Sequence, residues 1–188
     1  MAILLTGGTG KTSTRVASFL QNENIPFLLA SRRGASAAPA GMPAVKFDWL
    51  DKYTWQSPFE HKFADGSAIS AIYLMEPVVP EPWVPLNEFI DYASKEHGVK
   101  RFVLVAGTSS EPGKPGMGMV WQHFLDRGVD FCVLRPSWFM GTYILSLILY
   151  LLIANSYCRE PNGGSPCLPH SRARQNLLCM RRWPDPLY

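Results

Sequence analysis

The chain has 188 residues, of which 47% are hydrophobic and 18% charged, and its formal net charge is +3. This length allows one domain with a substantial core, and the composition excludes an intrinsically disordered chain. The small charge and the lack of a long basic run argue against nucleic-acid binding. The four cysteines include no Cys-x-x-Cys pair, so we expect neither a metal site nor a disulfide framework. No basic segment precedes the first apolar run, so we expect no secretory signal and a cytoplasmic location.

The N-terminal segment has the order strand, glycine turn, helix. An apolar run, Ala2–Leu5, leads into the turn, and a helical pattern extends from residue 11 to about residue 21. A P-loop would need a glycine where Leu5 stands, so that spacing fails. The pattern instead fits a Rossmann glycine motif in which Ser13 replaces the third glycine, with a purely structural turn as the alternative. A helix that begins at such a turn offers free N–H groups to a pyrophosphate. The predicted cofactor-binding residues of this segment are Gly7, Gly8, Thr9, Gly10, Lys11 and Thr12.

The second predicted strand, Pro26–Ala30, ends in a serine and two arginines, Ser31, Arg32 and Arg33. An NAD site places an acidic residue about 20 residues beyond the glycines, on the ribose 2′-hydroxyl. None stands here, and arginine forms charge-assisted pairs with phosphate. The sequence therefore predicts NADPH rather than NADH, with these three residues at the 2′-phosphate. A solvated basic loop is the alternative.

The remainder of the chain alternates between predicted strands and helices. Predicted strands cover Ala44–Trp49, Ala68–Met75, Arg101–Ala106 and Phe131–Arg135, and predicted helices cover Asp51–Phe59, Pro85–His97 and Met117–Arg127. Strands and helices thus alternate six times, which predicts an α/β fold: a Rossmann-like, doubly wound parallel sheet over residues 1–140.

Several residues near the predicted strand ends are further candidates. Asp48 and Trp49 end the third strand and can lie beside an adenine, although core packing explains Trp49 equally well. Ser109 and Ser110 follow the fifth strand, and with His123 they are candidate polar or acid groups near a nicotinamide. For His123 we favour the simpler interpretation of a solvated helix residue. A proline-rich loop that begins at Glu76-Pro77 lies near the expected path of the nicotinamide ribose.

Five blocks of the sequence carry a family resemblance. They are Thr6–Thr12, Lys46–Leu50, Arg101–Val105, Met117-Gly118 and Leu134–Met140. Together they resemble the NmrA-like atypical short-chain dehydrogenases, and most of all the festuclavine and agroclavine dehydrogenases of fungal ergot alkaloid biosynthesis. The resemblance implies reduction by NADPH of an iminium ion derived from chanoclavine-I aldehyde, which gives a festuclavine-type clavine. It also implies coupling to a separate flavin-dependent reductase of the old yellow enzyme type.

The sequence lacks the Tyr-x-x-x-Lys dyad with which ordinary short-chain dehydrogenases move a proton. Tyr92 is followed four residues later by Glu96, and Tyr53 by Ser57. A carbonyl reductase would need that proton donor, whereas an iminium carbon already carries the charge that hydride neutralises. The missing dyad is therefore consistent with iminium reduction. It is equally consistent with a non-catalytic NADP-binding regulator of the NmrA type, and a reductase of another small molecule is a third hypothesis.

The resemblance stops after Met140. An apolar run of 12 residues, Tyr143–Ala154, is short for a membrane span, which needs about 20. Residues 155–188 show no helical or strand period. The codons of Cys179–Tyr188, read one nucleotide later, permit Ala-Cys-Asp-Asp-Gly-Arg-Ile-Pro-Phe, which resembles a downstream segment of the family. We interpret 141–188 as the product of a retained intron or frameshift. If the segment is genuine, we expect a second subunit to supply the substrate half, or the chain to be inactive.

Overall fold

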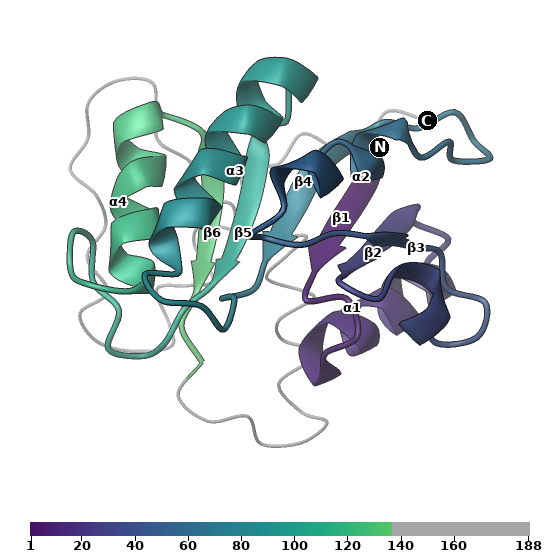
Figure 1. Ribbon diagram of the computed structural model, residues 1–188, viewed down its shortest axis with the longest axis horizontal. Coiled ribbons are helices and arrows are strands. Elements are labelled where there is room, and N and C mark those ends of the chain that lie inside the picture. Colours follow the sequence, from purple (N-terminus) through teal and green to yellow (C-terminus); the bar gives the residue numbers. More distant parts are fainter. Residues whose placement is uncertain (137–188) are drawn as a thin grey trace, which may run out of the picture.

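Residues 1–136 are described by the computed structural model in Figure 1. They form one six-stranded sheet in the order β3-β2-β1-β4-β5-β6. The strands are β1 (Ala2–Thr6), β2 (Phe27–Ser31), β3 (Ala44–Lys46), β4 (Ile69–Leu74), β5 (Arg101–Val105) and β6 (Asp130–Leu134). Every neighbouring pair is parallel. The predicted doubly wound sheet is therefore confirmed. The expectations for 141–188 and the Ser137–Met140 end of the last block lie outside the described residues.

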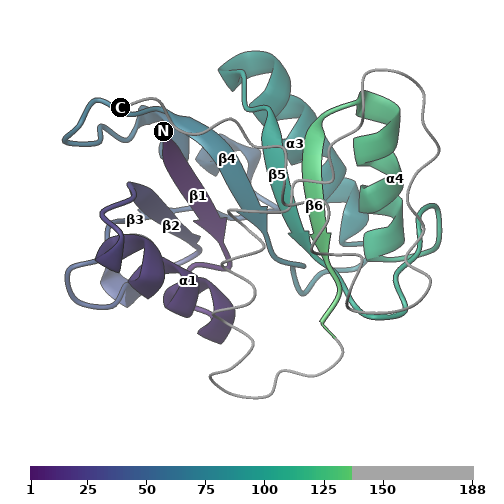
Figure 2. The same ribbon diagram turned by 180° about the vertical axis from the view of Figure 1, so that it is seen from behind.

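Helices cover both faces of the sheet. The helices are α1 (Lys11–Asn22), α2 (Ser57–Glu60), α3 (Trp83–His97) and α4 (Met117–Arg127). One apolar cluster joins the sheet to α3 and α4, and a second cluster on the other face contains Val16, Ala17 and Leu20 of α1. Figures 1 and 2 show this division from the two sides. Helices on opposite faces bury both sides of the strands, which explains why β5 is apolar over most of its length.

The connection from β3 to β4 differs from its prediction. β3 ends at Lys46 instead of Trp49, and the predicted helix 51–59 is a 3-10 turn, Lys52–Thr54, followed by the short α2. The hydroxyl of Thr54 explains the break, because it accepts from the Asp48 N–H at 2.8 Å and donates to the Asp51 carbonyl at 2.6 Å. These bonds close a tight turn where the periodicity had indicated a continuous helix.

The predicted elements include no helix between the second and third strands, and the described chain has only a 3-10 turn there, Gly34–Ala37. In addition, α3 and α4 end at the predicted residues, with Gly98 and Gly128 as their C-caps. Within residues 1–136, no helix combines the length and the apolar character that crossing a membrane requires.

Candidate functional site

The glycine turn lies between β1 and α1 and is bonded to the neighbouring strand. The Gly10 N–H donates to the Gly7 carbonyl at 2.7 Å, and the Gly8 N–H donates to the Ala30 carbonyl of β2 at 2.9 Å. Gly7 has a φ of +65°, a backbone conformation that favours glycine. The turn is therefore fixed at the carboxyl ends of β1 and β2.

Gly8 leaves no room for a side chain. A Cβ at this position would lie 2.9 Å from the Ala30 nitrogen and 2.9 Å from the Leu29 Cβ. Both atoms belong to the adjacent central strand, so neither can move away by a simple rotamer change. Packing against β2 is therefore sufficient reason for a glycine here, whatever binds on the outer side of the turn.

Ser13 packs α1 against the end of β1. The residue is fully buried, and its Oγ donates to the Thr6 carbonyl at 2.8 Å. A small side chain in the third position of the motif therefore permits close contact between helix and strand, as predicted. The hydroxyl thus provides a hydrogen bond to a buried carbonyl at the end of β1.

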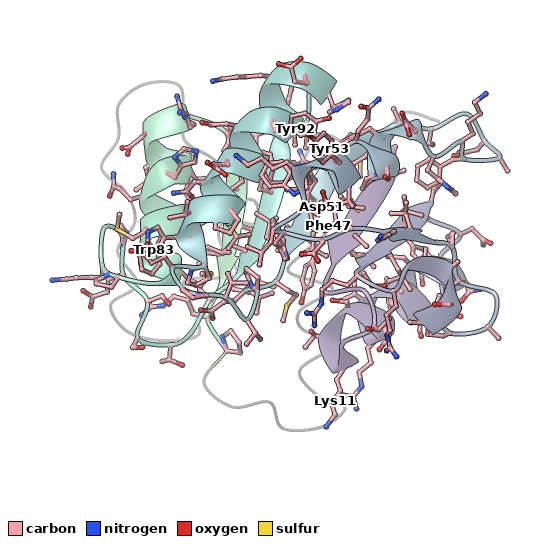
Figure 3. All side chains as sticks on the ribbon, viewed as in Figure 1. Lys11, Phe47, Asp51, Tyr53, Trp83 and Tyr92 are labelled. Atoms are coloured by element: carbon pink, nitrogen blue, oxygen red, sulfur yellow. The ribbon has the colours of Figure 1, made fainter. Side chains whose placement is uncertain are left out.

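The first turn of α1 fits an anion. No side chain caps this helix, and its first turn contains no acidic residue. Lys11, the first helical residue, is exposed and lies at the lower edge of the molecule in Figure 3. The free N–H groups and the helix dipole favour a phosphate at this position. The donor set thus suits the predicted pyrophosphate.

Thr6 joins the glycine turn to the end of β4. Its Oγ1 donates to the Tyr73 carbonyl at 2.9 Å and accepts from the Met75 N–H at 2.9 Å. The Met75 Cβ lies 3.1 Å from the position of a Cβ on Gly7. Glu76, the next residue, is therefore held at the same edge as the turn, at the switch point between β1 and β4. Sequence reasoning missed this link, although a threonine that ends an apolar strand just before a glycine is a usable signal.

The predicted 2′-phosphate residues lie beside the turn at the end of β2. Arg32 and Arg33 are exposed and form no ion pair within residues 1–136. The Ser31 Oγ donates to the Gly34 carbonyl at 3.4 Å. Because β2 is the neighbour of β1, the structure brings the two arginines and the glycine turn to one edge of the sheet.

Asp48 and Trp49 are engaged in the protein itself. The Trp49 ring lies edge-on to Phe47, with centroids 4.9 Å apart, and to Phe89 of α3, with centroids 5.5 Å apart. An Asp48 carboxylate oxygen accepts from the Leu50 N–H at 3.1 Å. These contacts favour the core-packing interpretation of Trp49.

The three polar candidates are divided between two places. Ser109 and Ser110 follow β5; Ser109 is exposed, and the Ser110 Oγ accepts from the Gly107 N–H at 3.1 Å. His123 lies instead between α4 and α3, where its Nε2 is 3.0 Å from the Asp91 Oδ1. Arg127 donates to the other oxygen of the same carboxylate at 2.6 Å. With its side chain 16% exposed, His123 is paired and largely buried, so the interpretation as a solvated helix residue is wrong.

Tyr73 is the one tyrosine of β4 and points into the core on the α1 side. The residue is 1% exposed, and the Thr12 side chain lies beside its hydroxyl without forming a hydrogen bond of good geometry. Burial raises the pKa of Tyr73 to about 12. Its phenol therefore stays neutral over the physiological range. Among the described residues, no group of three His, Cys, Asp or Glu side chains is placed to hold a metal ion.

This strand order, with a glycine turn between the first strand and the first helix, defines a Rossmann-type nucleotide-binding fold. The NADPH complex of yeast methylglyoxal/isovaleraldehyde reductase matches 73% of this chain and 55% of that chain, with a TM-score of 0.57 and 13% identity. The NAD complex of UDP-glucose 4-epimerase from Thermus thermophilus matches 72% and 54%, with a TM-score of 0.55 and 16% identity. These likenesses establish the fold alone.

Sequence comparison is more specific. The chain is 40% identical to agroclavine dehydrogenase of Claviceps fusiformis over 147 residues, which are 76% of this chain and 48% of that protein. It is 40% identical to festuclavine synthase II of Penicillium roqueforti and to festuclavine dehydrogenase of Aspergillus fumigatus, each over 143 residues, 74% of this chain and 48% of the relative. No family model matches. Over about three quarters of its length, the chain is similar in sequence to agroclavine and festuclavine dehydrogenases. It spans about half the length of these relatives.

Proposed function

We propose that this chain carries the cofactor half of an NADPH-dependent iminium reductase of clavine alkaloid synthesis. The proposed substrate is the iminium ion derived from chanoclavine-I aldehyde, and the product is a festuclavine-type clavine. The observation that carries the proposal is the 40% identity to agroclavine and festuclavine dehydrogenases over about three quarters of the chain. The glycine turn and the uncapped start of α1 support the cofactor assignment independently.

The residues at the sheet edge fit NADPH. The glycine turn and the first N–H groups of α1 would hold the pyrophosphate, with Lys11 adding a positive charge. Arg32 and Arg33 would pair with the 2′-phosphate, because both are exposed beside the turn and neither has an acidic partner among residues 1–136. Bound NADPH supplies the hydride.

The proposed reaction needs no proton from the protein. A hydride forms a C–H bond at the iminium carbon, and the π electrons of the C=N bond move to the nitrogen, which becomes neutral. The protein then has to hold, orient and shield the two reactants. The absence of a Tyr-x-x-x-Lys dyad from the sequence agrees with this requirement.

The chain matches about half the length of its relatives, so the substrate half lies outside the matched residues. We propose a second subunit as its source. The iminium ion itself would come from a flavin-dependent reductase of the old yellow enzyme type. The pure chain is then expected to turn over poorly, and full activity without a partner would contradict the two-subunit proposal.

The second candidate function is NADP binding without turnover, as a regulator of the NmrA type or an inactive truncated reductase. The missing proton-transfer dyad favours it. Substrate-dependent consumption of NADPH separates the two, since only the reductase consumes cofactor. The identity of the product then separates iminium reduction from reduction of another small molecule.

The first test is a fluorescence titration of the chain with NADPH and with NADH. We expect NADPH to bind more tightly, and an Arg32→Ala/Arg33→Ala variant to lose roughly tenfold in NADPH affinity with little change for NADH. A Lys95→Ala/Lys100→Ala variant removes the same charge from exposed positions at the far end of α3 and is the matched control. Equal losses in both variants, or no preference for NADPH, would contradict the assignment of the arginines.

A further inference from the structure

The loop that follows β4 lines one side of a shallow, open cavity on the surface. Its volume is about 510 Å³, and its lining residues are Glu76, Pro77, Val78, Val79, Pro80 and Pro82. Apart from Glu76, the lining is made of proline and valine side chains, which offer C–H surfaces and no charge. Val78 is fully exposed to solvent, so its side chain is free to contact a ligand.

The position of Glu76 is fixed relative to the glycine turn. The preceding residue, Met75, donates its N–H to the fully buried Thr6, and its Cβ contacts the turn at Gly7. Glu76 therefore begins the loop at the switch point of the sheet, where ligands of this fold class bind. The cavity opens next to the proposed cofactor position and not on a remote surface.

The carboxylate of Glu76 has no cation of its own within residues 1–136. It is exposed, and the ion pairs of this part of the chain involve Glu88 and Asp91 instead. Arg135, which follows β6, donates to the Thr108 carbonyl and lies 5.9 Å from the centroid of the Trp121 ring. Its guanidinium is therefore engaged elsewhere. The charges at the carboxyl ends of the strands are thus separated. Lys11, Arg32 and Arg33 lie around the glycine turn, and the Glu76 carboxylate lies beyond it.

We propose that Glu76 recognises the positive charge of an organic cation whose apolar body lies against the Pro77–Pro82 wall. A single carboxylate beside an apolar surface selects a molecule that carries both features, and it disfavours neutral and anionic molecules of the same shape. This inference rests on the proposed iminium reduction and adds the residue that distinguishes the cationic substrate from neutral carbonyl compounds. Glu76 is here a specificity residue and takes no part in bond making.

Isothermal titration with two probes tests the proposal on the full chain, with and without NADPH. The cationic probe is 2-methyl-3,4-dihydro-β-carbolinium, a fixed-charge cyclic iminium ion, and the neutral probe is the similarly shaped tetrahydrocarbazole. We expect the cation to bind more tightly, and Glu76→Gln to weaken cation binding about fivefold at low salt while tetrahydrocarbazole binding is unchanged. The preference should shrink at about 0.5 M salt because the carboxylate is exposed.

Glu81→Gln is the matched control, because Glu81 belongs to the same loop but does not line the cavity. We expect this variant to keep the wild-type affinity for the cation within about twofold. The proposal is overturned if the wild type binds both probes equally or neither, or if Glu76→Gln has no effect, or if both variants lose equally. NADPH affinity, measured in the same preparations, reports on the proposed function separately: loss of cofactor binding alone would refute the reductase and leave the cation result interpretable.

Discussion

Replacing Gly8 by alanine tests the idea that the glycine turn is packed against β2. The new Cβ would lie 2.9 Å from the Ala30 nitrogen and 3.0 Å from its carbonyl oxygen, closer than real Cβ contacts. Because β2 is hydrogen-bonded to strands on both sides, the turn has to move instead, which would weaken the bond from the Gly8 N–H to Ala30. Overpacking of this kind costs about 1–3 kcal/mol. The reduced freedom of the unfolded alanine chain returns about 0.4–1 kcal/mol.

We therefore expect Gly8→Ala to lower the free energy of unfolding by about 1–2 kcal/mol. For a chain of this size that is a fall of about 2–8 °C in the melting temperature, measured by circular dichroism during thermal unfolding. Gly107→Ala is the control, because its Cβ would meet only the Ser110 Oγ at 3.8 Å and its φ is not positive. A Gly8→Ala chain as stable as the Gly107→Ala chain would refute the packing argument. It would leave contact with a ligand as the reason for this glycine.

Other positions give further tests. Thr6→Val leaves the Met75 N–H and the Tyr73 carbonyl without their buried partner, so urea unfolding should show a loss of about 1–3 kcal/mol, whereas Thr6→Ser should restore most of it. Tyr73→Phe removes a buried hydroxyl whose interaction with Thr12 is at most weak, so stability at pH 7 should change by less than about 1 kcal/mol. The folded pKa of Tyr73, about 12, lies above its ordinary value of 10.0, so the unfolded chain loses this proton first and the fold is destabilised as the pH rises from 10 toward 12. The Phe variant should lack this part of the decline in urea unfolding at several pH values. A Cβ on Gly118 would overlap the Glu111 carbonyl oxygen, so Gly118→Ala should lower the melting temperature, and an unchanged value would contradict the tight fold of the loop over α4. Burial raises the pKa of Cys132 to about 11, so iodoacetamide at pH 8 should label this thiol only in urea, as read by peptide mass spectrometry; equal labelling of the folded chain would contradict its burial.

Local patterns predicted most of the sheet because each strand and helix here carries its own signal. Apolar runs marked all six strands, and the predicted ends of α3 and α4, at His97 and Arg127, agree with the structure. The errors came from contacts between residues distant in the sequence or from side chains that compete with the backbone. The Thr54 hydroxyl divides a predicted helix, and Asp91, 32 residues before His123, gives that histidine a partner that no local pattern indicates.

The candidate site shows the same limit. Its glycines, Ser13 and the two arginines follow from a spacing rule, and the structure brings them to one edge. The hydrogen bond from the Met75 N–H to Thr6 joins residues that are 69 positions apart, so only the strand order reveals that the loop at Glu76 begins beside the glycine turn.

The placement of β1 in the middle of the sheet has a consequence for how the chain folds. β1 pairs with β2, to which it is connected by α1, and with β4. The β4 residues that pair with β1 lie 67 to 68 positions later in the sequence. Pairings of such long range require closure of a large loop and form slowly compared with helices. During synthesis, the site at the carboxyl end of β1 is therefore incomplete until β4 has been made and has paired with β1. A nascent chain released before residue 75 would have the glycine motif but lack the strand that completes the site around it.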